Sequence, residues 1–465
     1  MHIEQIYTGC LAQGAYYIRS ENEAAIIDPL RETQPYTSRA EKDGVKIKYI
    51  FETHFHADFV SGHVDLAKKT GAQIVFGPNA KTTYESYVAK DGEEFKVGKI
   101  TIKVLHTPGH TLESSTFLLL DENKKPYCIF SGDTLFIGDV GRPDLAIKSD
   151  LTQEDLAGML FDSLHNKIKP LPDDVIVYPA HGAGSACGKN MSKDTFDTLG
   201  SQKQKNYALV MTNKEEFVKE LTSGILPPPQ YFSKNAALNK SGYSAFDEVM
   251  KKGSKALSPA EFESHANESE TLVLDVRKPE EFAREHIPNS IFIGIDGQFA
   301  PWVGALITDL KQPIILITPA VREEEVVMRL SRVGYDNCSG YLKGGIEAWK
   351  KAGKKIESIK SISAEEFAPK INSGINILDV RKPGEYDNQH IKDVPNKPLD
   401  FINEWTTVVD PNVEYHIHCA GGYRSMIAAS ILKARGFDKL VDVAGGFAAI
   451  CKTNAPLTEV AACSK

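Results

Sequence analysis

Four apolar segments in the first half of the chain each run directly into a cluster of polar residues. The segments are residues 46–54, 99–106, 127–133 and 174–181. Their length and their content of Val, Ile, Tyr and Phe predict β-strands. Helical spacing of apolar residues lies between some of them, around 64–69 and 151–168. This pattern predicts sheets flanked by helices, with a functional site at the edge where the strands end.

The second half contains two copies of a smaller pattern. Leu274–Phe282 reads LDVRKPEEF and Leu378–Tyr386 reads LDVRKPGEY, and each copy has a later Gly-Gly pair. An offset of 104 residues, from position 274 to position 378, is too long for a solenoid unit, so we expect two copies of a small domain. A polar connection that begins near residues 227–229 precedes the first copy. The predicted domain boundaries are 1–245, 255–357 and 358–465.

Each copy alternates predicted strands with predicted helices. The apolar runs that predict strands are residues 271–276, 313–318, 375–380 and 414–418. The helical patterns are residues 323–334 and 425–436, which end at Gly334 and Gly436. Alternation of this kind predicts a parallel α/β sheet in each copy.

The composition limits the classes of protein to consider. Of the 465 residues, 42% are hydrophobic and 25% are charged, which is typical of a globular protein. A net charge of −8 argues against a nucleic-acid partner, because phosphate contacts need a basic surface. No apolar run approaches the roughly 20 residues that span a bilayer, and the N-terminus has no signal-peptide pattern. Seven scattered cysteines fit a reducing compartment, so we expect a cytoplasmic protein with no membrane partner.

The polar clusters after the four predicted strands are rich in metal-ligand types. They contribute His54, His56, Asp58, His110, Asp133 and His181. A single histidine is usually an ordinary core or surface side chain. Imidazoles and carboxylates that end four strands can instead converge on one ion. The sequence therefore predicts a metal site at this edge.

These motifs resemble the metallo-β-lactamase superfamily over residues 1 to about 240, including the AIIDP segment at 25–29. The resemblance implies an αββα sandwich, followed here by the two smaller α/β domains. The common hydrolases of the superfamily hold two metals with a His-x-His-x-Asp-His motif. In this chain Phe59 stands where the last histidine is expected. Phenylalanine cannot coordinate a metal, which argues against a dinuclear hydrolase.

Within the superfamily, the domain is most similar to the persulfide dioxygenases. Two imidazoles and one carboxylate leave open positions on a metal and are typical of non-haem Fe(II) oxygenases. The resemblance implies one Fe(II) per chain, bound by His54, His110 and Asp133, where a thiol persulfide and O2 give sulfite and the thiol. The remaining candidates either orient ligands and substrate or only make hydrogen bonds at the sheet edge. They are His56, Asp58 and His181.

A loop arginine leaves two interpretations open. Arg142 follows Asp133 in the segment Gly141–Asp144. The family places an arginine in this loop beside the substrate, so Arg142 is a candidate for binding the thiol carrier. The alternative is a salt bridge to Asp144, because such pairs are common.

In the last domain, a predicted strand delivers Cys419 to a short loop. The loop continues with Ala420, Gly421, Gly422, Tyr423 and Arg424, and the predicted helix starts at Ser425. Two glycines let backbone N–H groups turn inward. The helix N-terminus and the arginine add positive potential, which favours the reactive thiolate.

The loop and the repeated Asp-Val-Arg motif resemble the rhodanese family. Four residues between Cys and Arg give a tighter loop than the five found in related phosphatases, which suits a single sulfane sulfur. The resemblance implies that Cys419 carries sulfur as a persulfide, with Arg424 as the second catalytic residue. Asp379 and Arg381 are expected to brace the domain core.

The middle domain lacks the nucleophile. Aligning Gly334 with Gly436 places Arg322 opposite Arg424 and Ile317 opposite Cys419, and a shift by one residue finds no cysteine either. Cys338 follows the predicted helix, on the wrong side of it. We expect this domain to act as a spacer or a docking surface.

Together these sites suggest one pathway: the metal domain makes sulfite, and sulfite collects sulfur from Cys419 as thiosulfate. The partners would be a low-molecular-weight or protein persulfide, O2 and sulfite, and the family suggests a homo-oligomer. The thiol carrier and the direction of the transfer step stay open. The alternatives are a dinuclear thioester hydrolase of the glyoxalase II type fused to rhodanese domains, and a sulfur-relay binding protein without catalysis.

Overall fold

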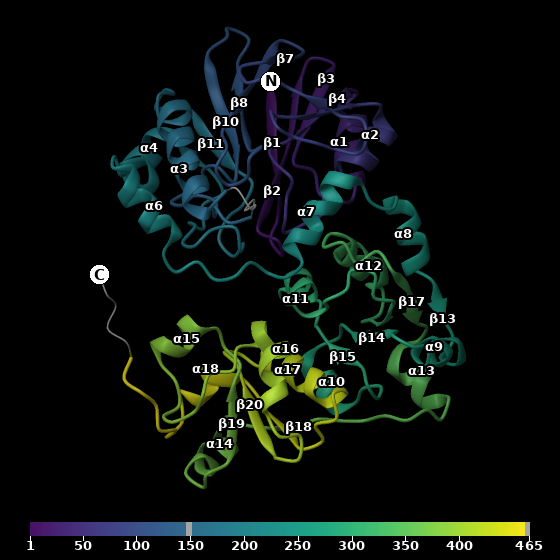
Figure 1. Ribbon diagram of the computed structural model, residues 1–465. Coiled ribbons are helices and arrows are strands. Elements are labelled where there is room, and N and C mark those ends of the chain that lie inside the picture. Colours follow the sequence, from purple (N-terminus) through teal and green to yellow (C-terminus); the bar gives the residue numbers. More distant parts are fainter. Residues whose placement is uncertain (146–150, 461–465) are drawn as a thin grey trace. The chain divides into compact units, whose positions relative to one another are not determined.

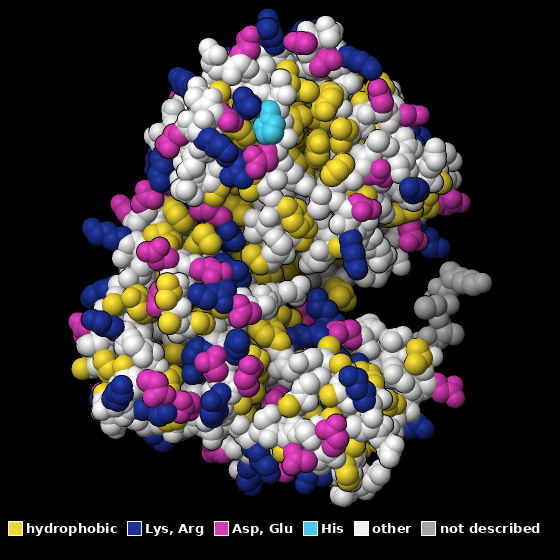
Figure 2. All heavy atoms as spheres, turned by 180° about the vertical axis from the view of Figure 1, so that it is seen from behind, with side chains coloured by type: hydrophobic (Ala, Val, Ile, Leu, Met, Phe, Trp, Pro, Cys, Tyr) yellow, Lys and Arg dark blue, Asp and Glu magenta, His cyan; other side chains and the backbone are white. Residues whose placement is uncertain are grey.

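The computed structural model describes residues 1–145 and 151–460. The chain divides into two compact units, the first formed mainly by residues 1–246 and the second by residues 247–330 and the residues from 335 onward. Among the described residues, no helix has both the length and the apolar character that crossing a membrane requires. Figure 2 shows acidic and basic side chains intermixed over one face.

The first unit contains two six-stranded sheets. The first sheet has, in spatial order, β1 (His2–Thr8), β2 (Gln13–Ser20), β3 (Glu23–Ile27), β4 (Lys46–Glu52), β5 (Gln73–Phe76) and β6 (Tyr87–Val88). The second sheet has β12 (Asp197–Thr198), β11 (Ile176–Pro179), β10 (Pro126–Gly132), β9 (Ser115–Leu120), β8 (Ile100–His106) and β7 (Glu94–Val97).

The sheets pack face to face, and helices cover their outer faces (Figure 1). One outer layer is α1 (Gln34–Asp43) and α2 (His63–Thr70), and the other includes α3 (Gln153–Ser163), a π-helical turn at Leu164–Ile168, α4 (Leu199–Lys205), α5 (Tyr207–Val210) and α6 (Lys214–Thr222). Strand β2 shows why both faces are buried: Tyr16 and Ile18 face the other sheet, whereas Ala15 and Tyr17 face α1. This is the expected αββα sandwich.

Two further helices, α7 (Phe232–Ser241) and α8 (Phe246–Gly253), follow the sandwich. The four strands predicted to carry the metal site correspond to β4, β8, β10 and β11. Strands β10 and β11 are parallel, and β8 has the same direction because β9 is antiparallel to both β8 and β10. The carboxyl ends of β8, β10 and β11 therefore meet at one edge of the second sheet, whereas β4 belongs to the first sheet.

The second unit contains two parallel sheets, and their first four strands follow the same order, as the sequence repeat predicts; β15 is a fifth strand in the middle domain. The middle domain has β13 (Ala256–Leu257), α9 (Pro259–Ala266), β14 (Leu272–Asp275), α10 (Pro279–Arg284), β15 (Ile291–Phe292), α11 (Phe299–Leu306), β16 (Ile314–Ile317), α12 (Glu323–Ser331), β17 (Cys338–Leu342) and α13 (Gly345–Lys351). The Asp-Val-Arg motif follows β14 here and β19 in the last domain.

The last domain has β18 (Lys360–Ile362), α14 (Ala364–Ile371), β19 (Asn376–Asp379), α15 (Pro383–Asn388), short helical turns at Leu399–Phe401 and Thr406–Val408 that flank α16 (Ile402–Trp405), β20 (Tyr415–His418), α17 (Tyr423–Ala434), β21 (Leu440–Val443) and α18 (Gly446–Ile450). Helix α17 begins at Tyr423 and not at the predicted Ser425. The reason is Gly422, whose φ of 101° turns the chain into the helix two residues earlier.

Candidate metal centre and cysteine loop

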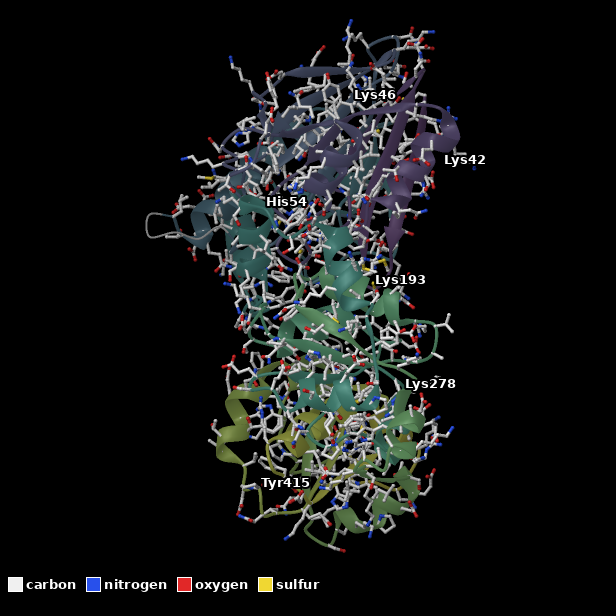
Figure 3. The ribbon with its side chains drawn as sticks, turned by 90° about the vertical axis from the view of Figure 1, so that its right-hand side faces the viewer. Lys42, Lys46, His54, Lys193, Lys278 and Tyr415 are labelled. Carbon is white, nitrogen blue, oxygen red and sulfur yellow. The ribbon has the colours of Figure 1, made fainter. Side chains whose placement is uncertain are left out.

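Three side chains from three strand ends converge inside the first unit. The ligand atoms of His54, His110 and Asp133 lie within 4.8 Å of one another, and all three residues are buried. Asp133 Oδ2 is 3.3 Å from His110 Nε2 and 3.8 Å from His54 Nε2. His54 lies among packed side chains in the interior of this unit (Figure 3).

Three of the converging atoms lack hydrogen-bond partners among the described residues. Both carboxylate oxygens of Asp133 and Nε2 of His110 are buried and unpaired among the described residues. Buried polar atoms are normally satisfied, so a group of orphaned acceptors points to an ion that would complete them. The N2O donor set leaves open positions on a six-coordinate metal and fits Fe(II).

Hydrogen bonds fix which nitrogen of each histidine faces the centre. Thr53 Oγ1 donates to Asp28 Oδ2 at 2.9 Å, so it accepts from His54 Nδ1, also at 2.9 Å. His110 Nδ1 donates to the carbonyl oxygen of Arg142 at 2.8 Å. Both rings are therefore held with Nε2 unprotonated and directed at Asp133.

A glycine lets the two sheets approach at this point. Gly132, at the end of β10, has a φ of 54°, and a Cβ atom there would lie 2.7 Å from the Thr53 side chain. Any other residue would push the Asp133 loop away from the loop after β4. Gly132 thus keeps Asp133 near His54.

Burial sets the protonation states in the metal-free protein. It lowers the pKa of His110 to about 4, and burial together with neighbouring imidazoles lowers the pKa of His54 well below its usual range. Burial raises the pKa of Asp133 to about 6. The imidazoles are therefore neutral, which is the form that binds a metal.

The second predicted group also comes together. One ligand atom from each of His56, Asp58 and His181 lies within 4.8 Å of the others. His56 Nε2, however, lies 3.1 Å from Asp28 Oδ1. Burial opposes a charge on this ring, but Asp28 and Glu52 raise the pKa of His56 to about 9. Its ion pair with Asp28 makes His56 a poor metal ligand in this arrangement.

Phe59 occupies the position where a second ion would need a ligand. Its ring is fully buried, with its centroid 4.3 Å from that of His56 and 6.3 Å from that of His181. The aromatic ring fills the space beside the second group and offers no lone pair.

The Arg142 side chain forms the loop salt bridge. Its Nε and Nη2 donate to the two carboxylate oxygens of Asp144 at 2.6 and 2.7 Å, and Nη2 also donates to the carbonyl of Leu226. The backbone of Arg142 contacts groups of the metal centre: its carbonyl accepts from His110 Nδ1, and its N–H donates to the carbonyl of Cys187.

Three groups at this centre were not found from the sequence as parts of the site. Asp28 and Thr53 hold His54, and Cys187 lies within 4.8 Å of Asp133 and His181. Asp28 lies in the AIIDP segment, which indicated the family but did not indicate that Asp28 would bind Thr53. Cys187 lies in a loop with no pattern that could have indicated it.

We expect Thr53→Val to weaken iron binding about tenfold to a hundredfold, the usual effect of removing a group that orients a ligand. Valine keeps the shape but removes the hydroxyl that His54 and Asp28 share. Competition with a ferrous chelator measures the affinity. Thr101→Val, which removes a buried hydroxyl on β8 that accepts from Lys124 Nζ, is the control. Equal iron affinity in the two variants would contradict the role given to Thr53.

The predicted cysteine loop closes around its sulfur. Cys419 is buried, and Gly422 N donates to its Sγ at 3.1 Å. The second glycine of the later Gly-Gly pair is needed at this contact, because a Cβ on Gly446 would lie 2.4 Å from the carbonyl oxygen of Cys419. Phe447 N donates to that same oxygen at 2.6 Å. The absence of a side chain at Gly446 therefore allows α18 to pack closely against the cysteine loop.

The arginine of the loop is held by a carboxylate. Arg424 donates through Nη1 and Nη2 to Glu385 at 2.6 and 2.7 Å. Tyr423 turns out of the loop, and its hydroxyl donates to the carbonyl of Gly294 in the middle domain at 2.6 Å. Asp379 and Arg381 form a buried ion pair, as expected for residues that brace the core.

A cavity of about 360 Å³ opens onto Cys419. Its lining comprises Lys382, Glu385, Cys419, Gly421, Tyr423 and Arg424 from the last domain, and Gln298 and Trp302 from the middle domain. The middle domain thus contributes to the wall of this cavity, which the sequence did not reveal.

Sheet register corrects the alignment of the middle domain. Asp275 pairs with Ile317 and the equivalent Asp379 pairs with His418, so Ile317 corresponds to His418 and not to Cys419. Thr318 takes the place of Cys419. The alignment on the glycines was shifted because Gly334 lies 17 residues after Ile317 (334 − 317), whereas Gly436 lies 18 residues after His418 (436 − 418). The absence of a nucleophile at that position is unchanged.

Comparison with known proteins places these features in families. The metallo-beta-lactamase superfamily matches residues 8–181, and the rhodanese-like domain matches residues 258–352 and 363–453. The human mitochondrial persulfide dioxygenase ETHE1 is 32% identical over 214 residues, which are 46% of this chain and 76% of that protein. The probable hydroxyacylglutathione hydrolase glo2 of Schizosaccharomyces pombe is 33% identical over 160 residues, which are 34% of this chain and 58% of that protein. A crystal structure of a metallo-beta-lactamase from Staphylococcus aureus subsp. aureus COL is 33% identical, with a TM-score of 0.65, and covers 74% of this chain and 98% of that one.

Proposed function

Because this chain belongs to the persulfide dioxygenases of the metallo-beta-lactamase superfamily, fused to two rhodanese-like domains, we propose that it oxidises a thiol persulfide at an Fe(II) centre and forms thiosulfate through Cys419. The observation that carries the proposal is the convergence of His54, His110 and Asp133, with His110 Nε2 and both oxygens of Asp133 unpaired among the described residues. The proposed setting is sulfide detoxification in the cytoplasm, by a homo-oligomer with about one iron per chain.

The first reaction converts RSSH, O2 and water into RSH, sulfite and two protons. Bound Fe(II) supplies the redox chemistry that joins oxygen to the outer sulfur. His54, His110 and Asp133 would hold the metal and, as three ligands, would leave coordination positions for the substrate. The neutral rings add no charge of their own. One carboxylate neutralises only part of a 2+ charge, which leaves positive charge to attract an anionic persulfide.

The surrounding groups are proposed to orient the substrate. Asp58 and His181 lie beside Asp133, with His181 Nε2 3.6 Å from Asp133 Oδ1 and 3.5 Å from Asp58 Oδ1. Burial raises the pKa of Asp58 to about 6, so this carboxyl can hold or release a proton near neutral pH. His56, paired with Asp28, adds a positive charge at the same wall.

The second reaction moves one sulfur. A Cys419 persulfide, whose inner sulfur Gly422 N contacts, is attacked at its outer sulfur by sulfite, the S–S bond to Cys419 breaks, and thiosulfate leaves with the Cys419 thiolate restored. The N–H of Gly422 stabilises the sulfur anion. Lys382 and Arg424 line the cavity and favour an anionic acceptor. Ala420, Gly421 and Tyr423 complete the sulfur-binding loop.

Product analysis tests the proposal. The iron-loaded protein is given persulfides of glutathione, coenzyme A and a protein thiol, with and without added sulfite, and the products are measured by ion chromatography. We expect sulfite from at least one persulfide and thiosulfate when sulfite is added. Absence of both products from all three carriers would contradict the proposal.

The second candidate is a dinuclear thioester hydrolase. It is favoured by the second buried group, His56, Asp58 and His181, and by the similarity to a hydroxyacylglutathione hydrolase. Phe59 and the His56–Asp28 pair weigh against it.

Phe59→His should create a second metal site, because it adds an imidazole beside His56, Asp58 and His181, whose ligand atoms already lie within 4.8 Å of one another. Zinc titration followed by elemental analysis should show a second ion in this variant and not in the parent. Phe59→Leu, which enlarges the space without adding a ligand, is the control. If the histidine variant binds no more zinc than the leucine variant, Phe59 does not block a second site.

A further inference from the structure

A buried carboxyl group lies behind the cysteine loop, on the neighbouring strand. Ser425 Oγ, in the first turn of α17, is 3.6 Å from Cys419 Sγ. The same hydroxyl donates to Asp442 Oδ1 of β21 at 2.7 Å. Asp442 is only 4% exposed, and Ser361 Oγ donates to its other oxygen at 3.2 Å. A continuous hydrogen-bonded path therefore joins the sulfur to a buried carboxylate.

We propose that Asp442 accepts the proton of Cys419 through Ser425, so that these three residues form a proton relay for the sulfurtransferase step. The inference rests on the proposed function of Cys419 and adds to it the base that the reaction needs. Asp442 does not touch the reacting sulfur, so it is a positioning residue that acts through Ser425.

The proton count of the path is balanced. A hydroxyl carries one proton, and Ser425 gives it to Asp442 at 2.7 Å in preference to the carbonyl of Gly422 at 3.1 Å. Its lone pair then faces Cys419 and accepts from the thiol S–H. When that S–H bond breaks, Ser425 Oγ gains the proton and passes its own to Asp442 Oδ1. The products are a thiolate and a carboxylic acid, and the total charge stays at −1.

When Cys419 ionises, its thiolate accepts hydrogen bonds from two groups. Ser425 now donates to the thiolate, as does Gly422 N at 3.1 Å. Two donors to one sulfur anion offset the loss of the thiol proton. If Asp442 stayed ionised, Ser425 would keep donating its proton to Asp442. The lone pair of Ser425 would then face the thiolate and repel it.

Burial makes Asp442 a better base than an exposed aspartate. Desolvation raises its pKa to about 6, although the hydroxyls of Ser425 and Ser361 act in the opposite direction. A carboxyl with this pKa can both accept and release a proton near neutral pH. It also lines a cavity of about 380 Å³, through which the proton can later return to water, and this cavity shares Gly421 with the cavity lined by Cys419.

Other charged groups face this path from the surrounding elements. On the Cys419 side they are Lys382, Glu385 and Arg424, and on the Asp442 side they are Glu280 and Arg284 of α10, while His418 of β20 lies against Asp379. Arg424 is paired with Glu385. None of these hydrogen-bonds to Asp442 among the contacts of the described residues, so Asp442 is the group whose proton the sulfur shares.

The test is the pH dependence of Cys419 alkylation by iodoacetamide in the full-length protein, followed by mass spectrometry of the peptide that contains Cys419. In the parent, the rate should rise through the pH at which Asp442 titrates, about 6. In Asp442→Asn the shared proton is lost, so the midpoint should move up by at least about one pH unit, which lowers the rate roughly tenfold at a pH well below the parent midpoint and about twofold at pH 7. Simple removal of a repelling charge predicts the opposite, a midpoint that moves down.

A second variant and a control show whether a changed profile comes from the relay or from misfolding of Asp442→Asn. Ser425→Ala breaks the path but keeps the carboxylate and should also move the midpoint up. Ser430→Ala removes another buried hydroxyl of α17, which bonds to the carbonyl of Ile427, and should leave the profile unchanged. Thiosulfate formation is measured in parallel. If the parent protein forms no thiosulfate but the alkylation midpoints shift as predicted, the proposed function is wrong and the relay stands. Active parent protein with an unshifted or lowered midpoint in both relay variants would overturn the relay.

Discussion

Asp133→Asn should abolish iron-dependent persulfide oxidation while sulfur transfer at Cys419 continues. The carboxylate supplies the only anionic atoms of the proposed ligand set, and both of its oxygens are otherwise unpaired among the described residues. An amide offers one neutral oxygen and two N–H groups that cannot bind a cation. We expect iron affinity to fall by roughly a hundredfold or more, since removing a ligand exceeds the effect of removing a group behind it.

Iron content after desalting and O2 uptake with a persulfide measure this effect. Asp174→Asn, an exposed aspartate paired with Lys125 at the surface, is the matched control and should behave like the parent. The Cys419 loop belongs to the other compact unit, so thiosulfate formation from supplied sulfite should persist. Stoichiometric iron and full oxygen uptake in Asp133→Asn would refute the ligand assignment.

Cys419→Ser should change the product and not the oxygen chemistry. A serine hydroxyl is a poor sulfur acceptor and stays protonated, so the persulfide cannot form on it. Oxygen uptake should be nearly unchanged, and sulfite should accumulate at the expense of thiosulfate. Ion chromatography after a fixed oxygen consumption, corrected for the spontaneous reaction of sulfite with persulfide, measures the ratio.

Two other cysteines serve as controls for this result. Cys451→Ser changes an exposed cysteine of the same domain, and Cys338→Ala changes the buried cysteine of the middle domain, whose pKa burial raises to about 12. Both should keep the parent ratio of thiosulfate to sulfite. Enzymatic thiosulfate at the parent level from Cys419→Ser would show that the loop is not the site of sulfur transfer.

The sequence predicted those parts of the fold and site that depend on local pattern. Apolar runs that end in His, Asp or Cys identify strands and the residues just beyond them, and parallel strands bring such residues to one edge. This pattern gave six candidates, and the resemblance to the persulfide dioxygenases singled out His54, His110 and Asp133 among them. The structure places these three together. The repeated LDVRKP segment predicted two domains of one type, and the matching strand orders confirm this prediction.

The missing parts depend on contacts between residues distant in sequence. Asp28 holds Thr53 across the first sheet, Glu385 holds Arg424 from another helix, and Asp442 reaches Ser425 from a neighbouring strand. No spacing rule links such pairs. The one-residue error at Ile317 has a different cause: the segment from the strand end to the glycine that ends the helix is one residue shorter in the middle domain, and aligning the two glycines hides this difference.

The most direct test of the central claim combines metal stoichiometry with oxygen uptake. The apoprotein is loaded anaerobically with Fe(II) or Zn(II), desalted and analysed for bound metal, and each form is then given a glutathione persulfide or a glutathione thioester in an oxygen electrode. We predict about one iron per chain, O2 uptake with the persulfide by the iron form alone, and no uptake with the thioester. Two zinc ions per chain, with thioester hydrolysis and no oxygen uptake by either form, would contradict it.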